Sequence, residues 1–385
     1  MSTLKVGGIR GVSASSDAIT VANDGTCTAN ITNKPNRNLI INGAMQVAQR
    51  GTSSTTAGYE TVDRIETSVN DLDETPTFAQ VDVASGTTPY TSGFRKAFKM
   101  TNGNQTGGAG TVDKSEVHYK IEAQDIANSG WNYTSSSSFV TLSFWIKSSV
   151  AQNFFGHLKT TDGTAYNYPF ETGSLTADTW TKITKTIPGN SNLQFDNDNA
   201  VGLTILFYGF MGTALTGSVS LDTWAAYASA TRTPDQTSTW RTTNDATLEF
   251  TGLQLEVGST ATDFEHRSFG QELALCQRYY YRHAEGADHV PIGMSSAYTS
   301  TVHIGIAHFP CKMRANPTID APSASGYYRE VANGSTSLAN NFVMEDANST
   351  CCGFRTTGGS SITQGIAIYT RLGNASAYVA FDAEL

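Results

Sequence analysis

Long apolar runs are missing from this chain of 385 residues, and their absence bounds the class of protein. No stretch approaches the ~18 consecutive apolar residues that a membrane-spanning helix needs. The first residues, MSTLKVGGIRGVSASS, lack the continuous apolar segment of a secretory signal peptide. We therefore expect a soluble protein that does not insert into a membrane and that is assembled in a cytoplasm.

Charged residues are also scarce. They make up 15% of the chain, the formal net charge is −9, and Lys and Arg form no cluster. A nucleic-acid backbone is bound by clustered cations that displace its counterions. The sequence therefore predicts no nucleic-acid partner.

Cysteine is too sparse and too irregular for a disulfide framework. The count of five is odd, and Cys351 and Cys352 are adjacent, where a bridge between them would be strained. Unpaired thiols are typical of proteins assembled in a reducing cytoplasm.

Metal and cofactor motifs are absent as well. Residues 196–199, DNDN, place four oxygen-bearing side chains in a row but lack the alternating spacing and distal Glu of a calcium loop. His303 and His308 are five residues apart, so on one strand they would face opposite sides. The sequence predicts no metal and no cofactor.

Catalytic signatures are missing in the same way: no Gly-x-Ser-x-Gly, His-Glu-x-x-His, phosphate loop or dinucleotide fingerprint occurs. Hydrolysis of a glycan would need two carboxylates at a fixed separation. Glu249 and Glu256 are the candidate pair, although a bulge expected between them leaves their faces undecided. We predict that the chain is not an enzyme, with a polysaccharide depolymerase as one alternative.

What the chain does contain, from residue 37 to about 265, is a succession of short alternating segments. In FVTLSFWIKSS, Val140, Leu142, Phe144 and Ile146 share one face of a strand. Strands are predicted near residues 38–41, 64–68, 77–83, 95–100, 117–124, 139–147, 153–160, 165–171, 180–187, 201–210, 220–226 and 246–257. Without a long helical period before residue 268, this pattern predicts an antiparallel, jelly-roll-like β domain at 37–265.

The two ends differ from this middle part. Residues 1–36 hold AITVAN and TCTANIT on either side of Asp24-Gly25, which predicts a small hairpin that buries too little apolar surface to be stable alone. Residues 286–385 carry further strand patterns near 299–309, 317–319, 341–344, 352–356, 364–369 and 377–384. They predict a second, β-sandwich-like C-terminal domain of ordinary size.

Residues 248–283, LEFTGLQLEVGSTATDFEHRSFGQELALCQRYYYRH, connect the two domains. The alternation breaks phase beside Gly252, as a bulge would cause. Ser268 and Gln271 have the spacing of a capping box, which predicts a linker helix of ~3 turns within 266–285. Its apolar stripe is wider than a lone helix can hide, so we predict an oligomer interface at Leu273, Leu275, Cys276, Tyr279 and Tyr280.

The same stretch resembles a signature of bacteriophage tail-fibre and tail-spike proteins. LQLEVGSTATDFEHRSFGQELALCQRYYYR matches it, and so do RNLIINGAMQVAQRG at 37–51 with Asp63-Arg64, and FPCKMRANPTI at 309–319 with a terminal Glu-Leu. The resemblance implies a homotrimeric receptor-binding fibre in the virion. The N-terminal segment would then attach to other virion structural proteins.

VTLSFWIKSS and DTWTKITKTIPG, followed by the QLE strand, are similar to the jelly-roll sandwiches of carbohydrate-binding modules. Aromatic rings can stack on the C–H faces of sugars, and loop residues of a distal domain are suited to receptor contact. The candidate ligand-binding residues are Trp131, Tyr133, Trp145, Tyr166, Tyr168, Trp224, Tyr227, Tyr327, Tyr328 and Arg329. Core packing is the competing interpretation of each.

Together these patterns predict a phage fibre that attaches to the host by multivalent binding to cell-surface glycan. Besides the depolymerase, a structural collar or capsid fibre without a receptor of its own remains an alternative.

Overall fold

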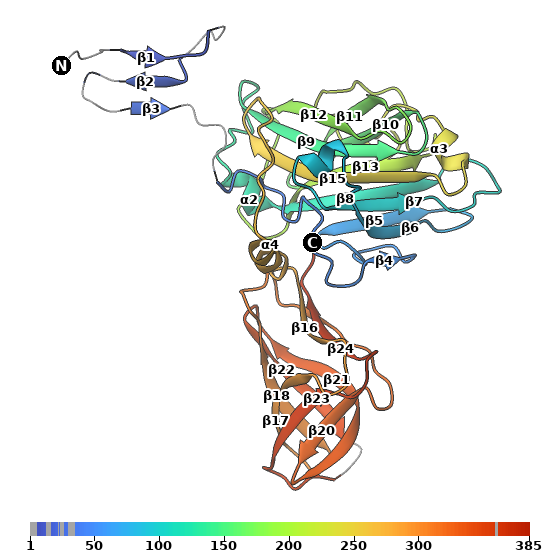
Figure 1. The fold of residues 1–385 in the computed structure, drawn as a ribbon, viewed down its shortest axis with the longest axis vertical. Helices are drawn as coiled ribbons and strands as arrows, with labels where there is room; N and C mark the ends of the chain where they lie inside the picture. Colours follow the sequence, from blue (N-terminus) through green and yellow to red (C-terminus); the bar gives the residue numbers. More distant parts are fainter. Residues whose placement is uncertain (1–5, 13–16, 22, 24–26, 30–34, 359–360) are drawn as a thin grey trace.

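The computed structural model describes residues 6–12, 17–21, 23, 27–29, 35–358 and 361–385 (Figure 1). Strands dominate these residues, so the predicted all-β class is confirmed. The helices among them are short: α1 (Thr88–Thr91), α2 (Ala123–Ala127), α3 (Thr239–Thr242) and α4 (Phe269–Cys276). Within the described ranges, no helix has the length and apolar character needed to cross a bilayer.

The middle of the chain folds into the predicted antiparallel sandwich of two sheets. The first sheet has the order β14 (Ala225–Ala226), β11 (Tyr166–Ser174), β10 (Asn153–Thr160), β13 (Val201–Met211), β8 (Lys114–Glu122) and β5 (Ile65–Asn70). The second has the order β12 (Thr181–Pro188), β9 (Phe139–Ser148), β15 (Thr247–Val257), β7 (Lys96–Thr101), β6 (Thr77–Asp82) and β4 (Ser53–Ser54). Residues 38–41, expected as a strand, are instead an irregular segment.

Alternating side chains build the core between the two sheets. Val140, Leu142, Phe144 and Ile146 of β9 all point inward, as their spacing predicts, and Phe144 meets Phe207 of β13 edge to face at 4.9 Å. Burying each side chain of this size contributes about 1.5–3 kcal/mol. The sandwich therefore has an extensive core of its own.

The predicted bulge lies in β15, where the register with β9 shifts between Thr251 and Gln254. Gly252 has a φ of +65°, and a Cβ there would lie 2.6 Å from the ring of Phe94. Both the backbone angle and the close ring therefore require glycine at this position.

The N-terminal segment forms a small sheet of β1 (Gly8–Ile9), β2 (Ile19–Val21) and β3 (Cys27–Ala29), set apart from the sandwich in Figure 1. β2 and β3 pair antiparallel, with Ile19 opposite Ala29. The turn expected at Asp24-Gly25 lies outside the described residues.

The C-terminal unit is β-rich, as predicted, but it closes into a barrel instead of forming a second sandwich. The barrel order is β17 (Pro291–Ala297), β18 (Val302–His308), β22 (Cys351–Gly358), β21 (Ser335–Ala347), β20 (Tyr328–Ala332) and β23 (Ala367–Leu372). β23 pairs with both β17 and β20, which closes the sheet and leaves no free edge. A three-stranded sheet of β16 (Tyr280–Glu285), β24 (Tyr378–Asp382) and β19 (Thr318–Asp320) lies between barrel and sandwich (Figure 1).

Helix α4 begins as predicted and ends early. The capping box of Ser268 and Gln271 is present. The helix stops at Cys276, and the chain from Tyr280 pairs with β24 as a strand, so the helix is shorter than the ~3 turns predicted within 266–285. The proposed domain boundaries at 36, 265 and 285 stay predictions.

Candidate functional site

The segments that carry the fibre resemblance meet between the sandwich and the barrel. We call this meeting place the joint: residues 37–64, Glu122, α4 with residues 277–280, Arg314, and residues 382–384. Arg314, from the FPCKMRANPTI segment, donates from Nε to the Ala383 carbonyl at 2.6 Å and from a terminal nitrogen to the Glu384 carbonyl at 2.7 Å. The resemblance therefore marks one physical structure that joins the two parts of the chain.

Arg64 is the centre of the joint. Its side chain is buried, and its guanidinium lies 3.5 Å from the centroid of the Tyr279 ring. It donates to the carboxylate of Glu384 and, at 2.7 Å, to the carbonyl of Lys120. Burial, the largest effect, would lower its pKa, but the surrounding groups together, Glu384 first among them, raise the pKa of Arg64.

A second arginine repeats this arrangement on the neighbouring tyrosine. The Arg50 guanidinium lies 3.5 Å from the centroid of the Tyr280 ring and pairs with Asp382 at 2.8 Å and Glu384 at 3.3 Å. Arg50 belongs to the first signature segment and Asp382 to the last strand. An arginine whose planar guanidinium stacks on a ring and also donates to oxygens holds one orientation well.

Three acids of the joint have both carboxylate oxygens occupied, namely Glu122, Asp63 and Glu384. Glu122 accepts from Arg278 on both oxygens at 2.8 Å and from the Tyr279 hydroxyl at 2.6 Å. Burial would raise the pKa of Glu122, but these hydrogen bonds lower it. Asp63 accepts from the backbone and side chain of Gln49, and burial still raises its pKa to about 6.

The structure of the joint contradicts three residues of the predicted oligomer interface. Cys276, Tyr279 and Tyr280 are buried inside the single chain, so they are not available to a second one. Their side chains pack where α4 meets the sandwich and the barrel. Leu275 is 37% exposed and Leu273 is half-buried, so an interface on this helix stays a prediction for those two residues.

Four of the predicted ligand-binding aromatics are core residues instead. Trp131, Tyr168 and Trp224 are buried in the sandwich and Tyr328 in the barrel unit. Their polar atoms form hydrogen bonds within the chain: Trp224 donates to the Pro188 carbonyl at 2.7 Å, and the Tyr328 hydroxyl donates to the Pro322 carbonyl at 2.7 Å. Each ring is held by residues distant in sequence, a property that composition does not reveal.

The remaining predicted residues are half-buried and lie in separate places. On the sandwich, the Tyr133 ring meets Phe195 at 5.0 Å, Trp145 packs outside the main core beside Trp180 and Phe264, and Tyr166 borders the main core. Tyr227 lies 4.3 Å from the Lys159 ammonium. On the barrel unit, Tyr327 borders the core and Arg329 contacts His289 at 2.8 Å and Asp288 at 3.4 Å. These side chains do not form one platform.

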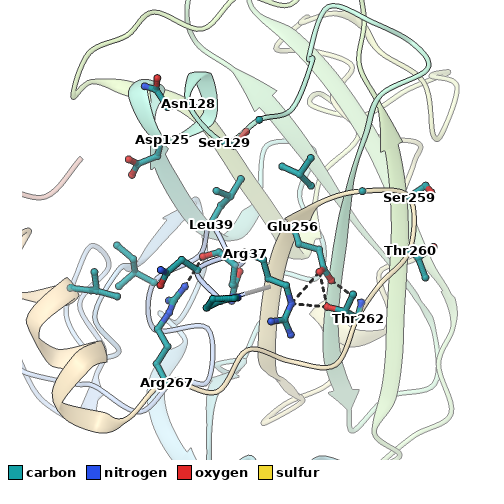
Figure 2. Close-up of a pocket in the computed structure, with 18 residues that line it drawn as sticks. Arg37, Leu39, Asp125, Asn128, Ser129, Glu256, Ser259, Thr260, Thr262 and Arg267 are labelled. Atoms are coloured by element: carbon teal, nitrogen blue, oxygen red, sulfur yellow. Dashed lines mark hydrogen bonds and ion pairs between the residues drawn. The ribbon is translucent and has the colours of Figure 1, made fainter. Parts of the chain in front are cut away.

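A groove of about 960 Å³ opens at the α2 and α4 end of the sandwich (Figure 2). Ligand sites in proteins commonly measure about 300–1,000 Å³. Its walls come from the segment before the sandwich, from the end of α2, from the loop after β15 and from α4. Side chains exposed on these walls include Asp125, Asn128, Ser259 and Thr260. Sequence reasoning missed all four as binding residues: no motif marks Asp125 or Asn128, and the segment that holds Ser259 and Thr260 was interpreted as a linker.

The charged residues of the groove also hold its walls together. Glu256 accepts from the backbone and hydroxyl of Thr262 at 2.8 and 2.7 Å, and it lies 3.4 Å from Nε of Arg37 (Figure 2). Arg267 donates to the Asn38 carbonyl at 2.7 Å. The floor adds apolar surface from Leu39, Ile41, Val257 and Leu275. The groove thus combines hydrogen-bonding groups with apolar contact area.

Glu249 and Glu256 are too far apart to act as a hydrolytic pair. They lie opposite Lys147 and Thr141 of β9, six residues apart on one strand. At ~3.3 Å per residue that separation is roughly 20 Å. Glycosidase carboxylates lie about 5–9.5 Å apart. Lys147 pairs with Glu249 at 3.1 Å, which gives that acid a structural partner.

No family model matches this chain, and no curated protein matches it. Solved structures that resemble it include a domain of tailspike protein 4 from bacteriophage CBA120, at 9% identity and TM-score 0.31. That match covers 58% of this chain and 22% of the tailspike chain. A CBM4 structure matches at 13% identity and TM-score 0.29, over 56% and 98% of the two chains. A family 11 carbohydrate-binding module from Clostridium thermocellum matches at 12% identity and TM-score 0.24, again over 56% and 98%. At these scores the likenesses carry no argument about what this chain binds.

Proposed function

We propose that this chain is a subunit of a phage virion fibre that attaches to the host by binding cell-surface glycan in the groove. The observation that carries the proposal is the wall composition: exposed amide, carboxylate and hydroxyl groups beside an apolar floor. A sugar presents hydroxyls along its edge and C–H groups on its faces, so both kinds of surface are needed.

The joint supports the fibre part of the proposal. A fibre must keep its parts in a fixed orientation, and the stacked arginines of the joint connect the sandwich to the strands next to the barrel. A weak glycan site on each of several chains gives strong attachment, because later binding events are effectively intramolecular. The N-terminal segment would meet other virion proteins.

Binding to a glycan array by the intact chain tests the groove. Thr260→Trp and Asn128→Trp would each fill it from an exposed position, and we expect about tenfold or greater loss of binding, since most of the contact surface is blocked. Thr237→Trp, exposed at the opposite α3 end of the sandwich, is the matched control. Unchanged binding in both groove variants would contradict the proposal, and a chain that binds no glycan would favour a structural collar.

A homotrimer is part of the proposal, and exposed apolar residues of the barrel support it. Met294 of β17 and Ile306 of β18 are 59% and 61% exposed, and the two strands pair side by side. Exposed apolar neighbours of this kind are suited to contact with a second chain. Light scattering should give the mass of a trimer, and Ile306→Asp should reduce it to that of a monomer.

The proposed fibre is a binding protein and not an enzyme. Incubation of the chain with host polysaccharide should release no new reducing ends. Release of such ends would favour the depolymerase alternative.

A further inference from the structure

The barrel interior contains a layer of polar side chains, one from each of its six strands. We call it the polar ring: Ser295 (β17), His303 (β18), Thr356 (β22), Ser337 (β21), Glu330 (β20) and Thr370 (β23). The strand register places them together, since Glu330 lies opposite both Ser337 and Thr370, and His303 lies opposite Thr356. A barrel of this size is normally filled by apolar side chains.

Some of the ring is hydrogen-bonded. Oε1 of Glu330 is 2.7 Å from Nδ1 of His303 and accepts from the Thr356 hydroxyl at 2.5 Å. The hydroxyls of Ser295 and Thr370 are 2.9 Å apart. Glu330, His303 and Thr356 have no exposed surface, so these contacts are shielded from solvent.

Three polar atoms of the ring have no partner among the described residues. They are Oε2 of Glu330, Nε2 of His303 and Oγ of Ser337. Buried polar groups in native proteins are nearly always paired, and each exception needs an explanation. Three unpaired polar atoms in one layer indicate a ligand or an ordered water that hydrogen-bonds to them.

The ring borders a pocket of about 200 Å³ at the end of the barrel. Glu330 and Ser337 line it, together with hydroxyl and amide side chains of the β20–β21 turn and of residues 361–363. Ala332 and Ile362 add apolar surface. In Figure 1 this turn lies at the tip of the barrel, farthest from the sandwich.

We propose that this tip pocket binds a single neutral monosaccharide unit at the end of a glycan chain. Its lining offers a carboxylate acceptor and several groups that both donate and accept, which matches adjacent sugar hydroxyls. An acidic sugar would be repelled by Glu330, because no Lys or Arg lines the pocket. The volume is about a fifth of that of the groove, so one sugar unit fits and a longer chain does not.

This is a second site, and it is separate from the groove. The groove lies at the sandwich end of the joint, whereas the tip pocket lies at the far end of the barrel (Figure 1). A terminal unit held at the tip would add end-group selectivity to whatever the groove binds. Neither site requires the other for its chemistry.

Saturation-transfer NMR on the intact chain tests the proposal, with methyl glycosides of glucose, galactose, mannose and N-acetylglucosamine as probes and glucuronic acid as the acidic comparison. At least one neutral glycoside should bind, and glucuronic acid should not. Glu330→Gln should weaken binding about tenfold or more, because a bond to a charged acceptor is lost. Thr363→Trp should abolish it by filling the pocket from an exposed loop position, without touching the ring.

Two controls keep the outcome clear. Glu345→Gln removes an exposed carboxylate on β21 that pairs with Arg355, and it should leave binding within about twofold. Thr260→Trp in the groove should have no effect on the monosaccharide signal. Absence of binding by every glycoside, or binding that survives Thr363→Trp, would overturn the proposal and leave the ring with water as its partner.

Discussion

The joint and the polar ring both bury ionisable side chains, but the hydrogen bonding of their carboxylates differs. In the joint, Glu122 and Glu384 each have both oxygens bonded to side chains of the same chain. In the ring, Glu330 has one oxygen with two partners and the other with none among the described residues. A structural carboxylate is complete within the fold, whereas an incomplete one is arranged for something outside it.

The joint and the ring also differ in their relation to the segments that resemble phage fibres. The segments that resemble phage fibres build the joint, and they also line much of the groove, including Arg37, Ser259 and Thr260. The ring and the tip pocket lie outside the matched segments. The resemblance therefore covers both the joint and much of the groove, while the tip pocket lies outside it.

The most severe test of the comparison is Arg64→Ala. It would leave Glu384 buried with Arg50 as its remaining partner and remove the stacking on Tyr279, so we expect a loss of about 3–5 kcal/mol in unfolding free energy. Guanidinium unfolding measures it. Arg355→Ala, which breaks an exposed pair with Glu345, should cost less than about 1 kcal/mol. Equal losses in the two variants would show that the joint is not a distinct structural centre.

The pH dependence of stability offers a second test of the joint. Burial raises the pKa of Asp63 to about 6 from 3.8, so the folded chain holds this proton more tightly than the unfolded chain. The contribution of protonated Asp63 to the unfolding free energy is fully present below pH ~4. It is lost as the pH rises through 6, which lowers the unfolding free energy by about 3 kcal/mol.

Asp63→Asn removes this titration, so its unfolding free energy should fall less between pH 4 and pH 6.5 than that of the native chain. Urea unfolding at intervals across this range gives both curves. Asp71→Asn, at an exposed carboxylate, should reproduce the native curve. Parallel curves for Asp63→Asn and the native chain would mean that Asp63 does not act as a buried acid.

Local patterns predicted much of the fold of both regions. Alternation located β10 at Asn153–Thr160 with the bounds that the structure has, and Gly252 marked the bulge in β15. The capping box marked the start of α4. These features depend on neighbours in sequence, which is why the sequence alone was sufficient.

The rest depends on contacts between distant residues. The end of α4 was missed because Tyr280 is drawn into pairing with Asp382, and no glycine or proline marks the stop. Trp131 was a candidate ligand-binding residue with core packing as the alternative, and it packs against Phe195, 64 positions later. The polar ring takes one residue from each of six strands, and in sequence Thr356 or Ser337 is an ordinary polar residue of an alternating strand.

Within the ring, the comparison predicts different effects for bonded and unbonded groups. Thr356→Val keeps the shape of the side chain but removes the hydroxyl that donates to Glu330 at 2.5 Å, so we expect a loss of about 1–3 kcal/mol. Thr357→Val, at the half-buried neighbouring position, should change the unfolding free energy by less than half as much. A neutral effect of Thr356→Val would mean that the carboxylate of Glu330 is not held by this bond.

Ser337→Ala should have the smallest effect on the isolated chain. The serine hydroxyl is buried without a protein partner, so its removal takes away an unfulfilled polar group and should change the unfolding free energy by less than about 1 kcal/mol in either direction. The same substitution should matter once a ligand is present. A glycoside that binds the tip pocket raises the stability of the native chain by mass action, and loss of a hydrogen-bonding partner in the variant should reduce that rise. Thermal unfolding with and without the methyl glycosides separates the two effects. If Ser337 holds an ordered structural water, the substitution should lower the stability even without ligand. If its hydroxyl faces the ligand, the substitution should lower the stability only when the sugar is bound.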